Sequence, residues 1–223
     1  MTKISRRDAL ATGFGLAALG TVLSHRGYAA DTATKDAVWR FAPVDVNLVG
    51  KMVYESYDAG GCLYGAFKGG VLAYASAVES VDSEAARIAR SCPFVAFRCA
   101  RGGFGRLKEL CGAVAGGVMF FSCFLDDYAD VCKLAAALGE YGRETPLPEY
   151  VPEKDDAPNF LRVVAKGLTC REMGGAWMKA ATDEQKKLVG ERCKRHTASI
   201  MMKAAELLNA HFAEKAAKAT KNA

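Results

Sequence analysis

The sequence predicts an all-α protein, a multi-helix bundle in which glycine- and alanine-rich helices pack closely. Apolar residues recur at helical spacing in one segment after another, which indicates amphipathic helices. Glycine and alanine are concentrated inside predicted helices, although each glycine lowers helix stability by about 1 kcal/mol. With 223 residues, of which 51% are hydrophobic, the chain is long enough for one sizeable core.

Residues 1–30 have the three-part layout of an export signal. Arg6 and Arg7 precede an apolar run at 9–23, and small residues at 27–30 offer a cleavage site. The run is shorter than the roughly 20 residues that span a bilayer. The paired arginines resemble a twin-arginine signal, which exports folded proteins. We therefore expect a periplasmic or otherwise exported protein without a stable membrane span after signal removal; an ordinary secretory signal is the alternative.

The first half of the mature chain, after a lead-in at 31–43, is expected to hold three helices, at 44–57, 62–78 and 83–90. Residues 58–61 interrupt the first two, and 92–99 are expected as a strand or a packed loop. The second helix is rich in small residues, which indicates close approach to another backbone. These are Gly65, Ala66, Gly69, Gly70, Ala73 and Ala75.

The second half is expected to follow a glycine loop at 101–105 with helices over 106–121 and 126–141. That loop lacks the preceding strand and the spacing of a nucleotide-binding loop. Four prolines and five acidic residues predict a surface connection over 143–158. Two helices complete a single domain of residues 31–223: one over 159–180, and one that starts at a capping box of Thr182 and Gln185 and runs to 213. The tail 214–223 is expected to fray.

The charge is too small to indicate a nucleic-acid partner. The formal net charge is +5, and residues 1–30 contribute +3 of it, which leaves about +2 for the mature chain. The same balance argues against binding to a membrane surface. No Ser/His/Asp arrangement, pair of acid/base carboxylates or cofactor fingerprint stands out, so the sequence predicts neither a catalytic residue nor a substrate.

Eight cysteines, all after residue 60, demand a chemical explanation, because a core of this size does not need disulfides to fold. C-x-x-C is absent, which excludes zinc ribbons and thioredoxin-like sites. C-x-x-C-H is absent as well, which excludes covalent haem of the usual type.

The segment 111–116, Cys-Gly-Ala-Val-Ala-Gly, resembles the central motif of the C-GCAxxG-C-C family of redox-active proteins, although that motif has glycine before cysteine. Gly61-Cys62, Thr169-Cys170 and Glu191-Arg192-Cys193 resemble the family's other three cysteine positions, and the similarity covers about residues 46–209. The same core occurs in split-Soret cytochrome c proteins, which add haem sites and carry an iron–sulfur centre.

The resemblance implies a redox function for four cysteines. An iron–sulfur cluster of undefined type would be held by Cys62, Cys111, Cys170 and Cys193 for electron transfer to a partner protein, and a homodimer is plausible. Arg171 replaces the histidine that commonly follows the third family cysteine, and the haem-attachment cysteines are missing. Covalent haem is therefore not expected.

The residues beside these cysteines suit an anionic four-thiolate shell. Arginines would supply positive charge, and glycines would let amides approach sulfur. His196 lies three residues after Cys193, so it either tunes or ligates the site or is an ordinary surface or supporting residue. The supporting residues expected on this basis are Gly61, Gly112, Gly116, Arg171, Arg192 and His196.

Alternatives remain open for function and for the other residues. The cysteines would also suit a metal-free disulfide or thiol–disulfide exchange protein, or a metal-binding module without redox cycling. Cys92 and Cys99 form a disulfide or are small buried residues, Cys132 is expected in the core, and Cys123 has no assigned role. Trp177, Met119, Met201 and Met202 are expected to be packing residues, and the basic run 186–195 a solvated helix face.

Overall fold

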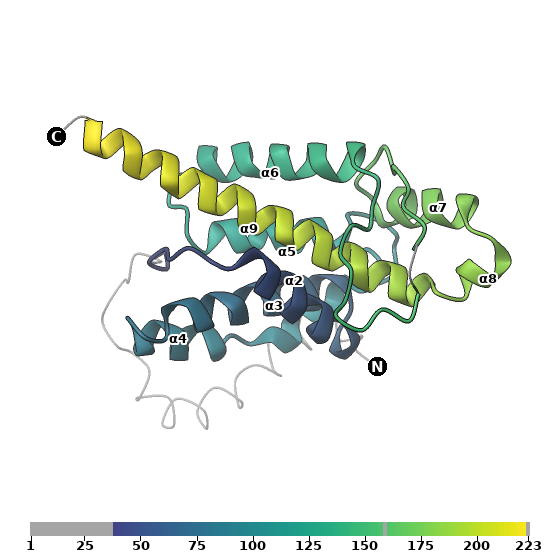
Figure 1. The fold of residues 1–223 in the computed structure, drawn as a ribbon, viewed down its shortest axis with the longest axis horizontal. Helices are drawn as coiled ribbons and strands as arrows, with labels where there is room; N and C mark the ends of the chain where they lie inside the picture. Colours follow the sequence, from purple (N-terminus) through teal and green to yellow (C-terminus); the bar gives the residue numbers. More distant parts are fainter. Residues whose placement is uncertain (1–37, 158–159, 222–223) are drawn as a thin grey trace, which may run out of the picture. The chain divides into compact units, whose positions relative to one another are not determined.

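The structure, a computed structural model, describes residues 38–157 and 160–221, and the all-α prediction is confirmed (Figure 1). Within these ranges there is no named strand, only two isolated bridges. The predictions on residues 1–37, including the export signal, lie outside the described residues. In chain order the helices are α2 (Val46–Ser56), the 3-10 helix η1 (Tyr57–Ala59), α3 (Cys62–Val78), α4 (Ser83–Arg90), the 3-10 helix η2 (Phe94–Ala100), α5 (Gly112–Ser122), α6 (Tyr128–Glu144), α7 (Cys170–Ala180), α8 (Asp183–Lys186) and α9 (Val189–Lys221).

Glycine allows the central helices to approach each other closely, as the sequence predicts. A methyl group added to Gly112 in α5 would come within 2.8 Å of a backbone amide in α3. One turn on, a methyl group on Gly116 would come within 2.4 Å of the Ala66 Cβ atom. Helices α3 and α5 therefore run parallel, with their N-termini at the same end. Likewise, a methyl group on Gly69 of α3 would overlap the Val53 backbone of α2, at 2.4 Å from its Cα atom.

At the opposite end of α3 and α5 lies an aromatic cluster, which we call the aromatic end: Trp39, Tyr74, Phe120 and Phe124. Trp39 stacks on Tyr74 with ring centroids 5.4 Å apart, and Phe124 meets Tyr74 edge to face at 4.8 Å. The Tyr74 hydroxyl donates a hydrogen bond to the Arg40 carbonyl at 2.7 Å. This region buries large rings and leaves the hydroxyl paired, as expected for a stable core.

Two predicted helices begin later in the structure than expected. The helix predicted over 106–121 starts at Gly112, because Phe104, Arg106 and Lys108 have positive φ angles of 49°, 67° and 66°, which a helix does not allow. The helix predicted over 159–180 starts at Cys170, where Thr169 and Glu172 form a capping box. Before it, the described residues run without helix and bridge back to Leu147.

Other predicted boundaries also need correction. Residues 92–99, expected as a strand or packed loop, lie largely in the 3-10 helix η2. The capping box of Thr182 and Gln185 is present, but it opens only the short α8, and α9 begins at Val189. The tail expected to fray is helical as far as Lys221. None of the described helices has the length and apolar character needed to cross a bilayer.

The basic run 186–195 is not a uniformly solvated face, so that expectation is wrong. Arg192 and Arg195 are each only 3% exposed. The Arg195 guanidinium donates to Glu191 and Asp155, both at 2.6 Å. Helix α9 therefore inserts two of its cations into the bundle, and their neighbours must accommodate the charge.

Candidate functional site: cysteines at converging helix N-termini

Three of the four predicted ligands stand where helices begin. Cys62 is the first residue of α3, Cys111 is the N-cap of α5, and Cys170 is the first residue of α7. Gly61 precedes Cys62 with a φ of 83°, a conformation that favours glycine and lets the chain turn into α3. A helix N-terminus carries partial positive charge and free amides, both of which favour a thiolate.

Direct contacts hold these three starting points together. A methyl group on Gly112 would lie 3.0 Å from the Cys62 Cβ atom, so the N-termini of α3 and α5 touch. An antiparallel bridge between Leu110 and Thr169 sets Cys111 opposite Leu168 and Cys170 opposite Glu109, so the two cysteines lie on either side of the bridge. The Cys111 amide donates to the Leu168 carbonyl at 2.9 Å, and the Cys170 amide donates to the Glu109 carbonyl at 2.6 Å.

The fourth cysteine comes from α9. Arg192 reaches Cys193 Sγ with Nη1 at 3.8 Å and the Met173 carbonyl of α7 with Nη2 at 2.8 Å. One turn further along α9, His196 Nε2 lies 3.9 Å from Cys111 Sγ. The structure thus brings Cys62, Cys111, Cys170 and Cys193 to one end of the bundle, which we call the cysteine end. Whether they hold a cofactor stays a prediction.

The thiols influence one another's ionisation. Burial is the main reason that the pKa of Cys62 is raised, and the charges of Cys111, Cys193 and Cys170 raise it further. The Tyr57 hydroxyl, 3.6 Å from Cys62 Sγ, acts in the opposite direction. Four thiols that repel one another as thiolates need a positively charged guest or neighbour before they all ionise.

Cys111 is the most enclosed of the four. Burial raises the pKa of its thiol to about 11, while the amides of Ala113 and Val114 and the Arg192 charge lower it. These amides belong to the first turn of α5, so the helix start at Cys111 favours the ionised form of its thiol. The local structure favours a thiolate and the burial opposes it, which is the balance expected for a ligand that ionises on binding.

Two buried polar side chains at this end lack a full set of partners. Arg192 Nε and His196 Nδ1 have no hydrogen-bond partner among the described residues. His196 is 2% exposed, and burial followed by the Arg192 charge holds its pKa well below the usual range. Of the alternatives for this histidine, only the surface position is wrong, because the ring lies inside the bundle beside Cys111.

The remaining supporting residues differ in their relation to the site. Gly61 and Gly112 adjoin Cys62, whereas Gly116 lies a turn deeper and packs on α3. Arg171 is exposed, and its backbone amide donates to the Lys108 carbonyl at 3.1 Å. Sequence reasoning missed Tyr57, whose only signal is its place five residues before Cys62.

All eight cysteines are free thiols in the structure. Cys92 is half-buried and Cys99 exposed, and no disulfide joins them. Cys132, expected in the core, is exposed, whereas Cys123 is half-buried and donates to the Met119 carbonyl at 3.4 Å.

The predicted packing residues are buried to different extents. Trp177 is fully buried in α7, and its ring nitrogen donates to the Leu161 carbonyl at 3.0 Å. Met201 is buried in the core, and Met119 and Met202 are half-buried.

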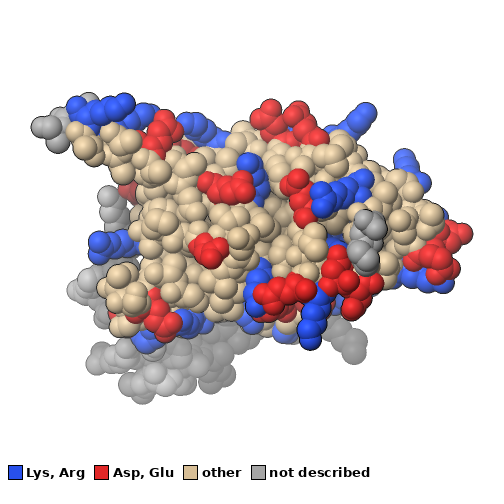
Figure 2. All heavy atoms as spheres, viewed as in Figure 1, with Lys and Arg blue, Asp and Glu red and all other residues tan. Residues whose placement is uncertain are grey.

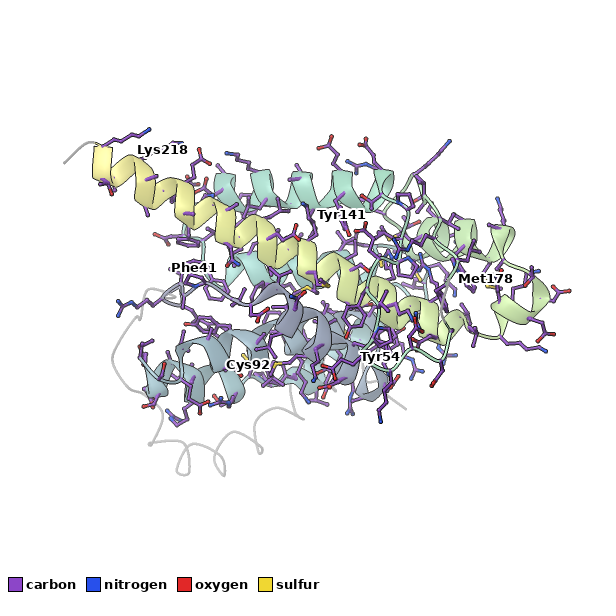
Figure 3. The ribbon with its side chains drawn as sticks, in the orientation of Figure 1. Phe41, Tyr54, Cys92, Tyr141, Met178 and Lys218 are labelled. Carbon is purple, nitrogen blue, oxygen red and sulfur yellow. The ribbon has the colours of Figure 1, made fainter. Side chains whose placement is uncertain are left out.

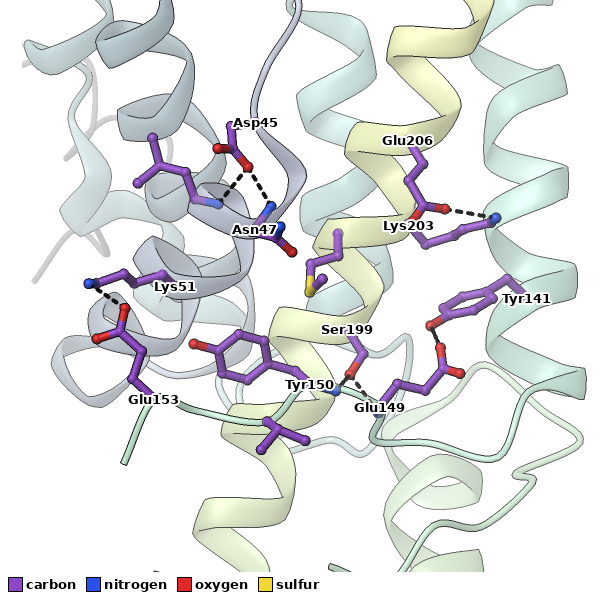
Figure 4. A pocket seen from close by; sticks show the side chains of 13 residues that line it. Asp45, Asn47, Lys51, Tyr141, Glu149, Tyr150, Glu153, Ser199, Lys203 and Glu206 are labelled. Atoms are coloured by element: carbon purple, nitrogen blue, oxygen red, sulfur yellow. Dashed lines mark hydrogen bonds and ion pairs between the residues drawn. The ribbon is translucent and has the colours of Figure 1, made fainter. Parts of the chain in front are cut away.

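A groove on another part of the bundle, about 650 Å³ in volume, is lined by α2, α6, α9 and residues 149–153 (Figure 4). Its charges are largely paired: Lys51 with Glu153 at 2.8 Å, and Lys203 with Glu206 at 3.0 Å. Ser199 Oγ accepts the amides of residues 149 and 150, both at 2.9 Å. No cysteine lines the groove, and its lysines are paired with carboxylates, so the cysteine end is the stronger candidate site.

No family model and no curated protein matches this chain. Among solved structures, it is similar to the split-Soret cytochrome c from Desulfovibrio desulfuricans. The two are 22% identical, the match covers 79% of this chain and 72% of that one, and the TM-score is 0.65. That cytochrome is described as containing a novel iron centre. The likeness establishes a shared fold with the split-Soret cytochrome c core, whereas membership of the C-GCAxxG-C-C family is not shown.

A single metal ion would need ligands gathered more tightly than those seen here. Within the described ranges, no three histidine, cysteine, aspartate or glutamate side chains are close enough together to hold one ion. A four-iron cluster makes a different demand, because each thiolate binds a different iron and the sulfurs stand further apart.

Proposed function

We propose that this chain is an exported redox-active protein that binds an iron–sulfur cluster through Cys62, Cys111, Cys170 and Cys193 and transfers electrons. The observation that carries the proposal is the meeting of these cysteines, from four helices, where the N-termini of α3, α5 and α7 converge. Four thiolates are the usual shell of [2Fe–2S] and [4Fe–4S] clusters.

The surroundings suit such an anionic group. Arg192 places a buried positive charge beside Cys193, and its guanidinium donates to that sulfur and to the Met173 carbonyl. A buried charge without a carboxylate partner is costly, and an anionic cluster would offset that cost. When bound, the cluster would supply reversible one-electron chemistry.

The protein's own groups would set how readily the cluster gains an electron. A ligating thiolate can only accept hydrogen bonds, so Tyr57 would donate to Cys62 and Arg192 to Cys193. His196 Nε2 would face Cys111. Hydrogen bonds to sulfur, burial and net charge are the protein's main means of tuning such a centre.

Two further lines support parts of the proposal. The split-Soret cytochrome c that shares this fold is described with an iron centre. The twin-arginine pattern at residues 1–30 supports export of a protein that folds, and receives its cofactor, before leaving the cytoplasm. Without a C-x-x-C-H segment, covalent haem is not part of the proposal.

The test is the iron and sulfide content of the full chain purified without oxygen. We expect a brown protein with both elements in stoichiometric amounts, and Cys111→Ser should abolish colour and iron while helical circular dichroism is retained. Cys132→Ser, an exposed cysteine away from the site, is the matched control and should keep both. Wild-type protein that stays colourless and iron-free would overturn the proposal.

The same proximity of thiols suits the second candidate, a metal-free thiol–disulfide protein. Cys62 and Cys111 lie on adjoining helix ends, since a methyl group on Gly112 would lie 3.0 Å from the Cys62 Cβ atom, so a bond between them is the first to test. Peptide mapping under non-reducing conditions separates the two functions. Iron-free wild-type protein with disulfides among the four cysteines would favour this candidate.

A further inference from the structure

Residues 101–110, which we call the site loop, lie directly against the cysteine end. A methyl group on Gly103 would come within 2.7 Å of the Cys170 Cβ atom, and the Glu109 carbonyl accepts the Cys170 amide at 2.6 Å. The Arg101 side chain packs at Gly61, where an added methyl group would lie 3.1 Å from its Cγ atom. Whatever approaches the cysteines from this side meets the site loop first.

The backbone of the site loop is strained and internally bonded. Phe104, Arg106 and Lys108 have positive φ angles, which are unfavourable for residues other than glycine and persist only where the surroundings impose them. The Lys108 amide donates to the Gly102 carbonyl at 3.2 Å, and the Gly105 amide donates to the Cys99 carbonyl at 2.7 Å. With these backbone donors used inside the loop, recognition at its surface falls to the side chains.

Those side chains combine exposed apolar groups with unpaired cations. Leu107 is 67% exposed, Val95 from the adjoining η2 is 64% exposed, and Leu110 and Phe104 are exposed as well. The cations beside them are all exposed, and none forms an ion pair in the described part of the chain. They are Arg98, Arg101, Arg106, Lys108 and Arg171, and the acids beside them are Glu109 and Glu172.

Elsewhere on the molecule the charges are mixed. Figure 2 shows acidic and basic side chains interspersed over one face, and many of the exposed lysines are paired with carboxylates, such as Lys187 with Glu184 at 2.8 Å. A cluster of five cations with two acids, bordered by exposed apolar residues, therefore stands apart. Such a combination steers a partner of opposite charge and then holds it by apolar contact.

We infer that the site loop, together with Val95, Arg98 and Arg171, is the docking surface for an acidic electron-transfer protein. The inference rests on the proposed function, since a redox centre here needs a partner within electron-transfer reach. Charge complementarity selects an acidic occupant, and the exposed Leu107, Val95 and Phe104 favour a protein over a nucleic acid. Docking here places the partner against the loop that contacts Cys170.

The test measures binding of two electron-transfer proteins to the full chain. One probe is a plant-type [2Fe–2S] ferredoxin of net negative charge, and the counter-probe is a c-type cytochrome of net positive charge. The double variant Arg106→Glu, Lys108→Glu reverses charge on the loop. The matched control is the double variant Lys218→Glu, Lys221→Glu, which reverses two charges on the last turn of α9 (Figure 3).

We expect the acidic probe to bind wild-type protein with strong salt dependence and the loop variant to bind it at least about tenfold more weakly. The control should stay within about twofold of wild type. The milder Arg106→Gln, Lys108→Gln variant should give an intermediate loss, which guards against misfolding of the reversed loop. Equal binding by wild type and the loop variant, or tighter binding of the basic probe or of duplex DNA, would overturn the inference.

Binding is measured on iron-loaded protein and on protein freed of iron by a chelator, because docking does not require the cluster. If the wild type never contains iron, the proposed function fails while the binding comparison can still be read. If iron and colour are intact in the loop variant and the acidic probe still binds as before, the docking inference alone fails.

Discussion

The two ends of helices α3 and α5 bury different kinds of side chain. At the aromatic end, Tyr74 and Phe120 are fully buried and the Tyr74 hydroxyl is paired. At the cysteine end, thiols, a buried arginine and a buried histidine meet, and Arg192 Nε and His196 Nδ1 lack partners. Burial of apolar surface explains the first end. The second end buries polar groups at a cost to stability, and the proposed cluster would offset that cost.

The sharpest test of this contrast is Phe120→Ala at the aromatic end. The ring is completely buried, so its loss should lower the free energy of unfolding by about 3–5 kcal/mol. The measurement is chemical denaturation of the full chain. If the two ends are independent, the folded fraction should keep wild-type iron content, and loss of iron from protein that is still folded would contradict that independence.

Arg195→Met tests a buried guanidinium that, unlike the one of Arg192, is paired with carboxylates. Arg195 is 3% exposed and bonded to both Asp155 and Glu191 at 2.6 Å. Its loss should cost about 2 kcal/mol, less than the 3–5 kcal/mol of a fully buried pair, because both carboxylates still reach water. Urea denaturation at neutral pH measures the loss, with Lys187→Met as the exposed control.

The ion pair between Arg195 and Asp155 predicts how the stability depends on pH. The hydrogen bond from Arg195 holds the pKa of Asp155 below its usual range. A lowered folded-state pKa adds stability above the unfolded value of about 4, and that stability is lost as the pH falls through the folded value. The stability gap between wild type and Arg195→Met should therefore narrow below about pH 4. A gap that stays constant down to pH 2 would show that the pair contributes no pH-dependent stability.

Arg192→Met, unlike Arg195→Met, should not destabilise the iron-free protein. Its guanidinium has the Met173 carbonyl and the Cys193 sulfur as acceptors and no carboxylate, so removing the charge should leave the iron-free protein as stable as wild type or up to about 1 kcal/mol more stable. Iron should be lost faster to a chelator, because the anionic shell loses its nearest buried cation. Marked destabilisation of the iron-free variant together with normal iron retention would assign Arg192 a purely structural role.

The sequence predicted which segments are helical better than where each helix starts. Apolar spacing and the Gly/Ala-rich segment 62–78 correctly indicated closely packed helices. The starts at Gly112 and Cys170 were missed. Arg106 and Lys108 have a left-handed backbone conformation, which the sequence does not reveal when the residue is not glycine. The burial of Arg192 and Arg195 was missed because a basic run at helical spacing normally faces water.

The candidate site was predicted by resemblance rather than by spacing. Cys62 and Cys193 are 131 positions apart, and no local pattern says that such distant residues meet. The structure adds Tyr57 and the burial of His196, both of which depend on how α9 and η1 pack. These contacts are tertiary, so periodicity along one helix does not reveal them.

Tyr57→Phe is the smallest of these changes and the most specific to the cysteine end. It removes a hydroxyl 3.6 Å from Cys62 Sγ while the ring remains, so the free energy of unfolding should change by less than about 1 kcal/mol. A lost donor disfavours the reduced, more negative cluster. An energy of about 1 kcal/mol corresponds to about 40 mV for a one-electron centre, so the midpoint potential should fall by up to that amount.

Voltammetry of the iron-loaded protein measures the shift, with Tyr128→Phe as the control, because Tyr128 is an exposed tyrosine at the start of α6. The control should leave the potential unchanged. An unchanged potential in Tyr57→Phe would mean that the hydroxyl does not reach a ligating sulfur. A change in midpoint potential in Tyr57→Phe but not in Tyr128→Phe would show that residues at the cysteine end tune a redox centre. The aromatic end of the same helices would then differ from it in serving stability alone.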